Sequence, residues 1–313
     1  MKNLLLATTA LVLTAGVAAA EVAVSGDGRM GVVYDGDEMN FESRARVKFT
    51  LSGETDGGLG FGASFRSHEA VDAEAGLEGS IYVSGAFGKV EMGDTVGASE
   101  ALLGDLPEVG FTDIGNNDIP YLTGDQNDTF FDVASGGADG AITAADNPSL
   151  LYTYTTGALS LAASFTDGYN DDRISTDDQE YALAASYNFG SYAVGLGYEV
   201  ADADGVGKAK MLGLGGTANF GDTAVKAFYG EGDDLIDGVK VYGLGVESAF
   251  GATTVAAFWQ TQDFDSVGLD KIAYYGIGAS YDLGGGAAVV GGVADSDEDG
   301  SDAVYDLGLQ FNF

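Results

Sequence analysis

Residues 41–52, FESRARVKFTLS, decide the fold, because apolar and polar side chains alternate there with a period of two. The apolar parity holds Phe41, Ala45, Val47, Phe49 and Leu51, and the polar parity holds Arg44, Arg46, Lys48, Thr50 and Ser52. Successive side chains of a strand point to opposite faces of its sheet. The pattern is therefore typical of a β-strand with one apolar and one polar face.

The same alternation recurs along the chain and predicts sixteen strands, with no helix after residue 20. The expected segments are 21–34, 41–52, 59–68, 78–85, 89–94, 149–156, 158–166, 179–189, 191–200, 208–220, 223–230, 239–250, 253–263, 270–283, 286–295 and 303–313. An even number of such strands predicts an all-β fold, a sixteen-stranded antiparallel transmembrane barrel.

Two kinds of connection join these segments. Seven are short and rich in glycine, as expected of hairpin turns. The last five hairpin units each have an aromatic residue at the end where the short turns lie. This spacing predicts an aromatic girdle at one membrane face: Phe189, Phe220, Phe250, Tyr281 and Phe313. The other connections are longer and acidic, for example 167–178 and 295–302, and suit external loops.

The first twenty residues predict a secretory signal peptide. Lys2 supplies a positive charge, residues 4–17 are apolar, and 18–20 are three alanines, so we expect cleavage after Ala20 and a mature barrel at 21–313. A membrane anchor is the alternative, but a spanning helix needs about 20 apolar residues. Such a leader and such strands predict the outer membrane of a Gram-negative bacterium.

Composition narrows the class further. The formal net charge is −36, and without Lys2 the chain would hold 12 basic and 49 acidic residues, so nucleic acid is not an expected partner. There is no cysteine, which excludes disulfides and thiolate metal sites. The hydrophobic fraction of 45% and the aromatic fraction of 11% argue against disorder.

Two other β architectures are weaker alternatives. A soluble β-sandwich also has many short strands, but it does not explain the two unlike kinds of connection. A calcium-loaded β-roll needs tandem nonapeptide repeats, which the sequence lacks. Alternation up to a terminal Phe313 is typical of outer-membrane barrels, so we expect Phe313 to act as a signal for the barrel-assembly machinery.

Several runs resemble the porins of purple non-sulfur bacteria of the Rhodobacter type. They are SGDGRMGVVYDGDEMNFESRARVKFTLSGETDGGLGFGASFRSHE (25–69), SGAFGKVEMGDTVGASEALLGDLPEVGFTD (84–113), NDIPYLTGD (117–125), FGATTV (250–255) and YYGIGASYDLGGG (274–286). The similarity covers the mature chain and thins across 129–145 and 236–239. It implies a homotrimer of sixteen-stranded barrels whose third external loop, here 95–148, folds into the lumen as a constriction.

Several basic residues lie on the polar parity of the first strands. They should line the lumen, because a charged side chain that faces lipid costs about 2–4 kcal/mol at the bilayer midplane. They are Arg29, Arg44, Arg46, Lys48 and Arg66, and His68 shares the parity of Arg66. Balancing acids lie in the third long connection: Glu100, Asp105, Glu108, Asp113 and Asp118. The resemblance implies wall arginines facing loop carboxylates, with Lys48 as an addition of this chain.

A transverse field across a narrow aqueous passage sieves polar solutes without a chemical step. We therefore expect a general-diffusion porin and no enzyme, with a solute-specific channel as the closer alternative and a barrel enzyme as the more distant one. Ser67 and His68 are strand neighbours that face opposite ways, so they cannot form a nucleophile and base pair. The glycines at 213–216 lie within a strand, where they keep side chains small.

A calcium-loop spacing occurs near the C-terminus. Asp295, Asp297, Asp299 and Asp306 occupy oxygen-donor positions around Gly300, so they form a candidate metal site, although an acidic surface loop is the simpler interpretation. Acidic external loops would also repel anionic lipopolysaccharide and outer-membrane lipid unless divalent cations bridge the two. No cofactor is required; structural calcium or magnesium is an expected partner.

Overall fold

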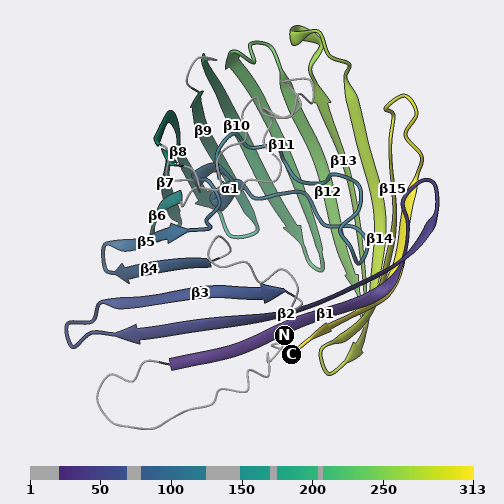
Figure 1. The fold of residues 1–313 in the computed structure, drawn as a ribbon, viewed down its shortest axis with the longest axis horizontal. Coiled ribbons are helices and arrows are strands. Elements are labelled where there is room, and N and C mark those ends of the chain that lie inside the picture. The colour runs from purple at the N-terminus through teal and green to yellow at the C-terminus, as the bar shows by residue number, and fades with distance from the viewer. Residues whose placement is uncertain (1–20, 69–78, 125–148, 170–174, 204–206) are drawn as a thin grey trace.

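A computed structural model describes residues 21–68, 79–124, 149–169, 175–203 and 207–313. In this part of the chain sixteen strands form one closed antiparallel barrel (Figure 1). They are β1 (Glu21–Tyr34), β2 (Met39–Glu54), β3 (Gly60–His68), β4 (Gly79–Gly85), β5 (Gly88–Gly93), β6 (Ser149–Thr156), β7 (Leu159–Tyr169), β8 (Ser175–Asn188), β9 (Tyr192–Ala203), β10 (Gly207–Phe220), β11 (Thr223–Asp234), β12 (Lys240–Phe250), β13 (Thr253–Asp263), β14 (Ile272–Gly284), β15 (Ala287–Ser296) and β16 (Val304–Asn312). The predicted fold class is confirmed, and the expected leader at 1–20 lies outside the described residues.

Closure of the sheet removes its edges. Each strand pairs with its neighbours in the chain, and β16 pairs with β1. The last residue takes part, because Phe313 N donates to Gly26 O at 2.8 Å and Gly26 N donates to Phe313 O at 3.2 Å. An open edge would leave a row of backbone donors and acceptors unsatisfied in hydrocarbon.

The two faces of the barrel differ as the alternation predicts. Large apolar side chains stand exposed on the outer parity, among them Val24, Phe41, Val47, Leu51, Phe65, Leu183, Leu196, Leu214, Leu244, Ile277 and Leu307. The aromatic residues at the short-turn end, namely Phe189, Phe220, Phe250, Tyr281 and Phe313, are 52% to 76% exposed. An apolar band with aromatic residues at its margin suits a surface that faces lipid.

Strand ends are the main departure from the sequence prediction. Expected segments 158–166, 179–189 and 223–230 extend on the long-connection side to Tyr169, Ser175 and Asp234, respectively. The added residues are largely polar, so the apolar alternation stops while the backbone ladder continues. These strands therefore extend beyond the apolar band.

The described residues also include two short helices that the sequence did not predict. They are α1 (Ala98–Leu103) and the 3-10 helix η1 (Asp265–Val267). Six residues make fewer than two turns of α-helix, too few for a helical period to appear in the sequence. No helix of the described segments is long and apolar enough to cross a membrane.

The buried core lies between the inner wall and the segment that follows β5. Buried residues of that segment, such as Leu103, Leu122 and Ile119, cluster with inward wall residues such as Met211 and Phe228. A smaller cluster joins Leu106, Val109 and Ile114 of the same segment to Phe258 and Ala294 of the wall. The loop thus supplies much of the apolar packing inside the barrel.

Candidate pore constriction

Residues 94–124 of the third external connection lie inside the barrel (Figure 1). Helix α1 packs against β6 to β10, and Phe111 reaches the opposite part of the wall at β1 and β16. Residues 94–124 thus follow an inward course, whereas residues 125–148 of the loop expected at 95–148 lie outside the described residues. We call residues 94–124 the constriction loop.

Glycines on the inward parity give the constriction loop room to lie close to the wall. A Cβ atom at Gly197 would lie 2.3 Å from Ser99 Oγ, and one at Gly245 would lie 2.1 Å from Pro107 Cδ, much closer than real Cβ contacts. Other inward glycines have a loop atom at 3.2 Å or less from such a Cβ: Gly31, Gly195, Gly215, Gly243, Gly278, Gly292 and Gly308. The expectation that glycine at 213–216 keeps side chains small is thus confirmed at Gly215.

Inward polar side chains hold the two ends of the loop. Glu199 of β9 is 1% exposed and accepts hydrogen bonds from Leu122 N and Thr123 Oγ1, both at 2.9 Å. Ser164 Oγ of β7 accepts one from Ala98 N at 3.0 Å. These contacts supply acceptors to buried donor groups of the loop, and burial of those groups without an acceptor would destabilise the fold.

The middle of the loop is held through its carbonyl groups. Gln260 Nε2 of β13 donates to Asp118 O at 3.0 Å and to Asn116 O at 3.3 Å. Lys226 Nζ of β11 donates to Asp105 O. None of the wall residues that hold the loop was predicted, because each contacts a loop residue far away in the sequence: the separation is 66 positions for Ser164, 77 for Glu199, 121 for Lys226 and 142 for Gln260.

The structure brings the predicted wall bases together on three adjacent strands. Arg29 of β1 lies opposite Arg44 of β2 in the register, and Lys48 of β2 lies opposite Arg66 of β3. Arg46 lies between them on the same face. We call these five residues the basic sector. His68 lies opposite Arg46 in the backbone register, but its side chain is outside what the structure describes.

Two carboxylates within the wall neutralise part of the basic sector. Arg29 Nη2 pairs with Glu42 Oε1 at 2.8 Å, and Arg44 Nη2 pairs with Asp27 Oδ1 at 3.0 Å. Sequence reasoning looked for counter-charge in the loop and missed both residues. The signal was present, because Asp27 shares the parity of Arg29, and Glu42 shares that of Arg44.

The predicted loop acids occupy different environments. Glu100 lies in the first turn of α1. Asp105 Oδ1 accepts a hydrogen bond from Ile119 N at 2.8 Å, which gives this carboxylate a role in the shape of the loop. Asp118 holds the loop through its backbone carbonyl, as described above. Glu108 and Asp113 are exposed to solvent.

Asp113 has an altered proton affinity. Its side chain keeps access to water, yet the loop and the encircling wall displace much of that water, and this desolvation raises the pKa to about 7. Repulsion from Glu108 and Asp118 raises the pKa further in the same direction. The loop charge therefore changes near neutral pH.

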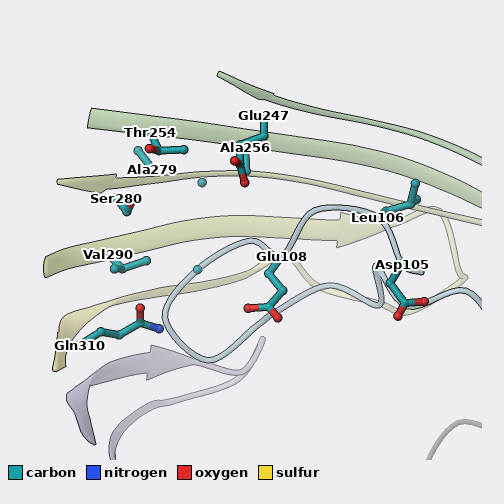
Figure 2. A pocket seen from close by; sticks show the side chains of 12 residues that line it. Asp105, Leu106, Glu108, Glu247, Thr254, Ala256, Ala279, Ser280, Val290 and Gln310 are labelled. Carbon is teal, nitrogen blue, oxygen red and sulfur yellow. The ribbon is translucent and has the colours of Figure 1, made fainter. Parts of the chain in front are cut away.

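A polar cavity of about 540 Å³ lies between the loop and the wall (Figure 2). Asp105 and Glu108 line it from the loop, and Glu247, Thr254 and Gln310 are among the wall residues that line it. Figure 2 shows Glu108 and Asp105 on the loop, with Glu247, Thr254 and Gln310 on the strands around it. This part of the lumen presents oxygen atoms to a passing solute.

The candidate metal residues are not brought together. Asp306 points into the lumen, where its carboxylate accepts hydrogen bonds from loop atoms, whereas Asp297 Oδ1 accepts one from Ala273 N and Asp295 Oδ1 one from Ser296 N. Among described residues no group of three or more acidic or histidine side chains could hold a metal ion. The site at Asp295, Asp297, Asp299 and Asp306 stays a prediction, although alternation along β16 turns Asp306 inward, where it binds the loop.

An apolar outer face, a polar lumen and an inward loop on a closed barrel define a passive channel of the outer membrane. The sequence profile of the Gram-negative porins matches residues 7–301, so this chain belongs to that family. It is a general-diffusion channel of the outer membrane, as the sequence predicted.

Two curated relatives and two solved structures illustrate the relationship. A porin of Rhodobacter capsulatus is 51% identical over 94% of this chain and 100% of its own length, and a porin of Fuscovulum blasticum is 29% identical with the same coverage. A solved porin structure with 51% identity aligns over 94% of this chain and 100% of its own with a TM-score of 0.81. A solved variant of the Rh. blastica porin, at 25% identity, aligns over 93% and 100% with a TM-score of 0.70. The predicted resemblance to Rhodobacter-type porins is confirmed.

Proposed function

We propose that solutes cross the barrel through a passage bounded by the basic sector on one side and by carboxylates of the constriction loop on the other. The observation that carries this proposal is the arrangement of the two surfaces: five bases share the inner face of β1 to β3, while Glu108 and Asp113 stand exposed on a loop that packs mainly against the other strands and meets β1 at Phe111. Fixed charges of opposite sign on facing walls produce a field across the passage.

Such a field selects by charge and polarity. A small hydrophilic solute exchanges part of its hydration for contacts with guanidinium groups and carboxylates, whereas an apolar solute must displace oriented water and gains little in return. Passage requires no chemical step, so the barrel acts as a channel and not as an enzyme. A solute-specific channel would need a lumen shaped for one solute, and no described feature favours that alternative.

The experiment measures conductance and size exclusion together. Purified full-length protein is reconstituted in planar bilayers and in liposomes, and swelling rates are compared for neutral sugars of increasing mass. We expect stable ohmic channels and a swelling rate that falls smoothly with sugar size. A protein that folds fully but forms no channel, or a single sugar that enters far faster than smaller ones, would contradict the proposal.

The finer biological setting is also part of the proposal. We infer a homotrimer, supported by relatives that are porins, with a leader removed after Ala20 and with insertion by the barrel-assembly machinery through Phe313. Divalent cations, calcium or magnesium, bridge the acidic external connections to lipopolysaccharide and outer-membrane lipid, because two anionic surfaces repel each other without them. Of the described residues, Asp297, Glu298 and Asp299 lie close together in one such connection.

A further inference from the structure

Asp306 of β16 meets the constriction loop at a single point. It is 5% exposed, and its Oδ2 atom accepts hydrogen bonds from Phe111 N at 2.9 Å, Thr112 N at 2.8 Å and Thr112 Oγ1 at 2.7 Å. The second oxygen, Oδ1, accepts one from Gly292 N of β15 at 3.0 Å. One buried carboxylate therefore satisfies three donors of the loop and remains tied to the neighbouring strand.

The wall also holds the backbone carbonyl and the ring of Phe111. Phe111 O accepts hydrogen bonds from Gln310 Nε2 at 3.1 Å and from Arg29 Nη1 at 3.4 Å. The Phe111 ring is 1% exposed and lies over Gly31 and Gly308, where a Cβ atom would approach it to 2.8 Å and 3.0 Å, respectively. Both polar groups of the Phe111 backbone and its ring are thus fixed by the wall.

A carboxylate is the chemical group this contact requires. Three loop groups donate to Oδ2 and Gly292 N of β15 donates to Oδ1, so both positions need an acceptor, which a carboxylate supplies with its two oxygens. Asparagine has one acceptor oxygen, and its amide would face a donor. Gly110, just before the contact, leaves space that a Cβ atom would fill at 2.5 Å from Asp306 Oδ1.

From this geometry we propose that Asp306 is a positioning residue of the channel: it fixes the Phe111–Thr112 part of the loop and so holds Glu108 and Asp113 across the lumen from the basic sector. The proposal rests on the proposed role of the loop as constriction. Glu108 lies three residues before Phe111 and Asp113 one residue after Thr112, so release of the contact would free both carboxylates. Asp306 does not itself have to touch a solute.

The expected effect follows from the number of bonds lost. At roughly a factor of five per hydrogen bond, removal of the three loop contacts raises the detached fraction of the loop by on the order of a hundredfold. Asp306→Asn keeps one acceptor oxygen and should give an intermediate effect. Thr112→Val removes one contact of the three and should give the smallest effect.

The test observes the loop directly. Because the chain has no cysteine, a single Glu108→Cys substitution takes one nitroxide label, and its mobility is measured by EPR in folded full-length protein. Backgrounds are wild type, Asp306→Ala, Asp306→Asn, Thr112→Val and, as matched control, Glu247→Gln, which removes a luminal carboxylate that lines the same cavity as Glu108. We expect a mobile component that grows from Thr112→Val to Asp306→Asn to Asp306→Ala and is absent in Glu247→Gln.

A label as immobile in folded Asp306→Ala as in wild type would overturn the proposal. If Asp306→Ala does not fold, Asp306→Leu, which is similar in size and offers no acceptor, decides: an unchanged spectrum there overturns the proposal equally. A mobile label in Glu247→Gln as well would mean that loss of luminal charge, and not loss of the contact, frees the loop. Label mobility is read without any ion current, whereas the wild-type conductance tests the proposed function, so failure of one is distinguishable from failure of the other.

Discussion

Asp27 lies directly opposite Arg46 in the register of β1 and β2, yet its carboxylate pairs with Arg44 at 3.0 Å. Among the described residues the wall thus supplies two carboxylates to the basic sector, Asp27 to Arg44 and Glu42 to Arg29. The Nε atoms of Arg29, Arg44 and Arg46 are buried and have no hydrogen-bond partner among the described residues.

The glycines beneath the constriction loop should be sensitive to a single methyl group. Gly245→Ala places a Cβ atom against Pro107, so the loop must move into the lumen or the barrel must distort, at a cost of about 1–3 kcal/mol. We expect a lower thermal unfolding midpoint and a lower single-channel conductance. Gly216→Ala is the matched control, because its Cβ meets only Ala193 O at 3.6 Å. Equal behaviour of the two variants would show that the loop does not rest on these glycines.

The pKa of Asp113 predicts a change of selectivity near neutral pH. Because desolvation and neighbouring carboxylates raise this pKa to about 7, the loop gains a negative charge as pH rises through that value, and cation selectivity should increase. The folded state also holds this proton more tightly than the unfolded chain, so the Asp113 contribution to stability falls as pH rises from about 4 to about 7. Zero-current potentials measured from pH 5 to 8 should follow a titration curve in the wild type.

Asp113→Asn should flatten that titration, and asparagine tolerates the left-handed backbone of this position, where φ is 60°. A titration of the same midpoint and amplitude in Asp113→Asn would assign the proton to another group.

Much of this fold follows from the sequence, because side-chain alternation is imposed at every residue by lipid on one side and water on the other. Arg44 and Arg46 could be placed in the lumen for that reason alone. The contacts of Asp306 and Glu199 could not be predicted, since they depend on the path of a loop that meets them from 195 and 77 positions away. The spacing of the acidic residues between 295 and 306 suggested that Asp306 binds a metal ion. The alternation of side chains along β16 instead predicts that Asp306 lies on the inner face of the barrel, where it holds the loop.

The C-terminal residue should govern assembly. Deletion of Phe313 removes both backbone hydrogen bonds to Gly26 and an exposed aromatic ring at the short-turn end. We expect normal secretion but impaired insertion, measured as the amount of folded, heat-modifiable protein in the outer membrane. Phe250→Ala controls for the loss of an exposed aromatic at the same end. Normal amounts of folded protein after the deletion would contradict the role of Phe313.

Divalent cations should stabilise the assembled protein if carboxylates bind them in the external connections. An ion that binds only the folded state raises the unfolding midpoint, and the shift grows with the logarithm of the free ion concentration once that exceeds the dissociation constant. Excess chelator at fixed ionic strength should therefore lower the thermal transition of the oligomer, and calcium or magnesium should restore it. An unchanged transition in chelator would count against bound cations.

The central claim, that the basic sector faces the narrowest part of the passage, is tested most directly by charge reversal. Arg44→Glu with Arg46→Glu reverses two charges of the sector. Lys208→Glu with Lys210→Glu reverses two charges at the long-connection end of β10, where each lysine pairs with an aspartate at 2.7 Å.

The measurement is the zero-current potential across a bilayer under a tenfold salt gradient. We predict a large shift toward cation selectivity for the arginine pair, a much smaller one for the lysine pair, and a decrease of both as the screening length falls from about 10 Å at 0.1 M to about 3 Å at 1 M salt. Equal shifts from the two pairs would mean that the arginines are solvated wall far from the constriction.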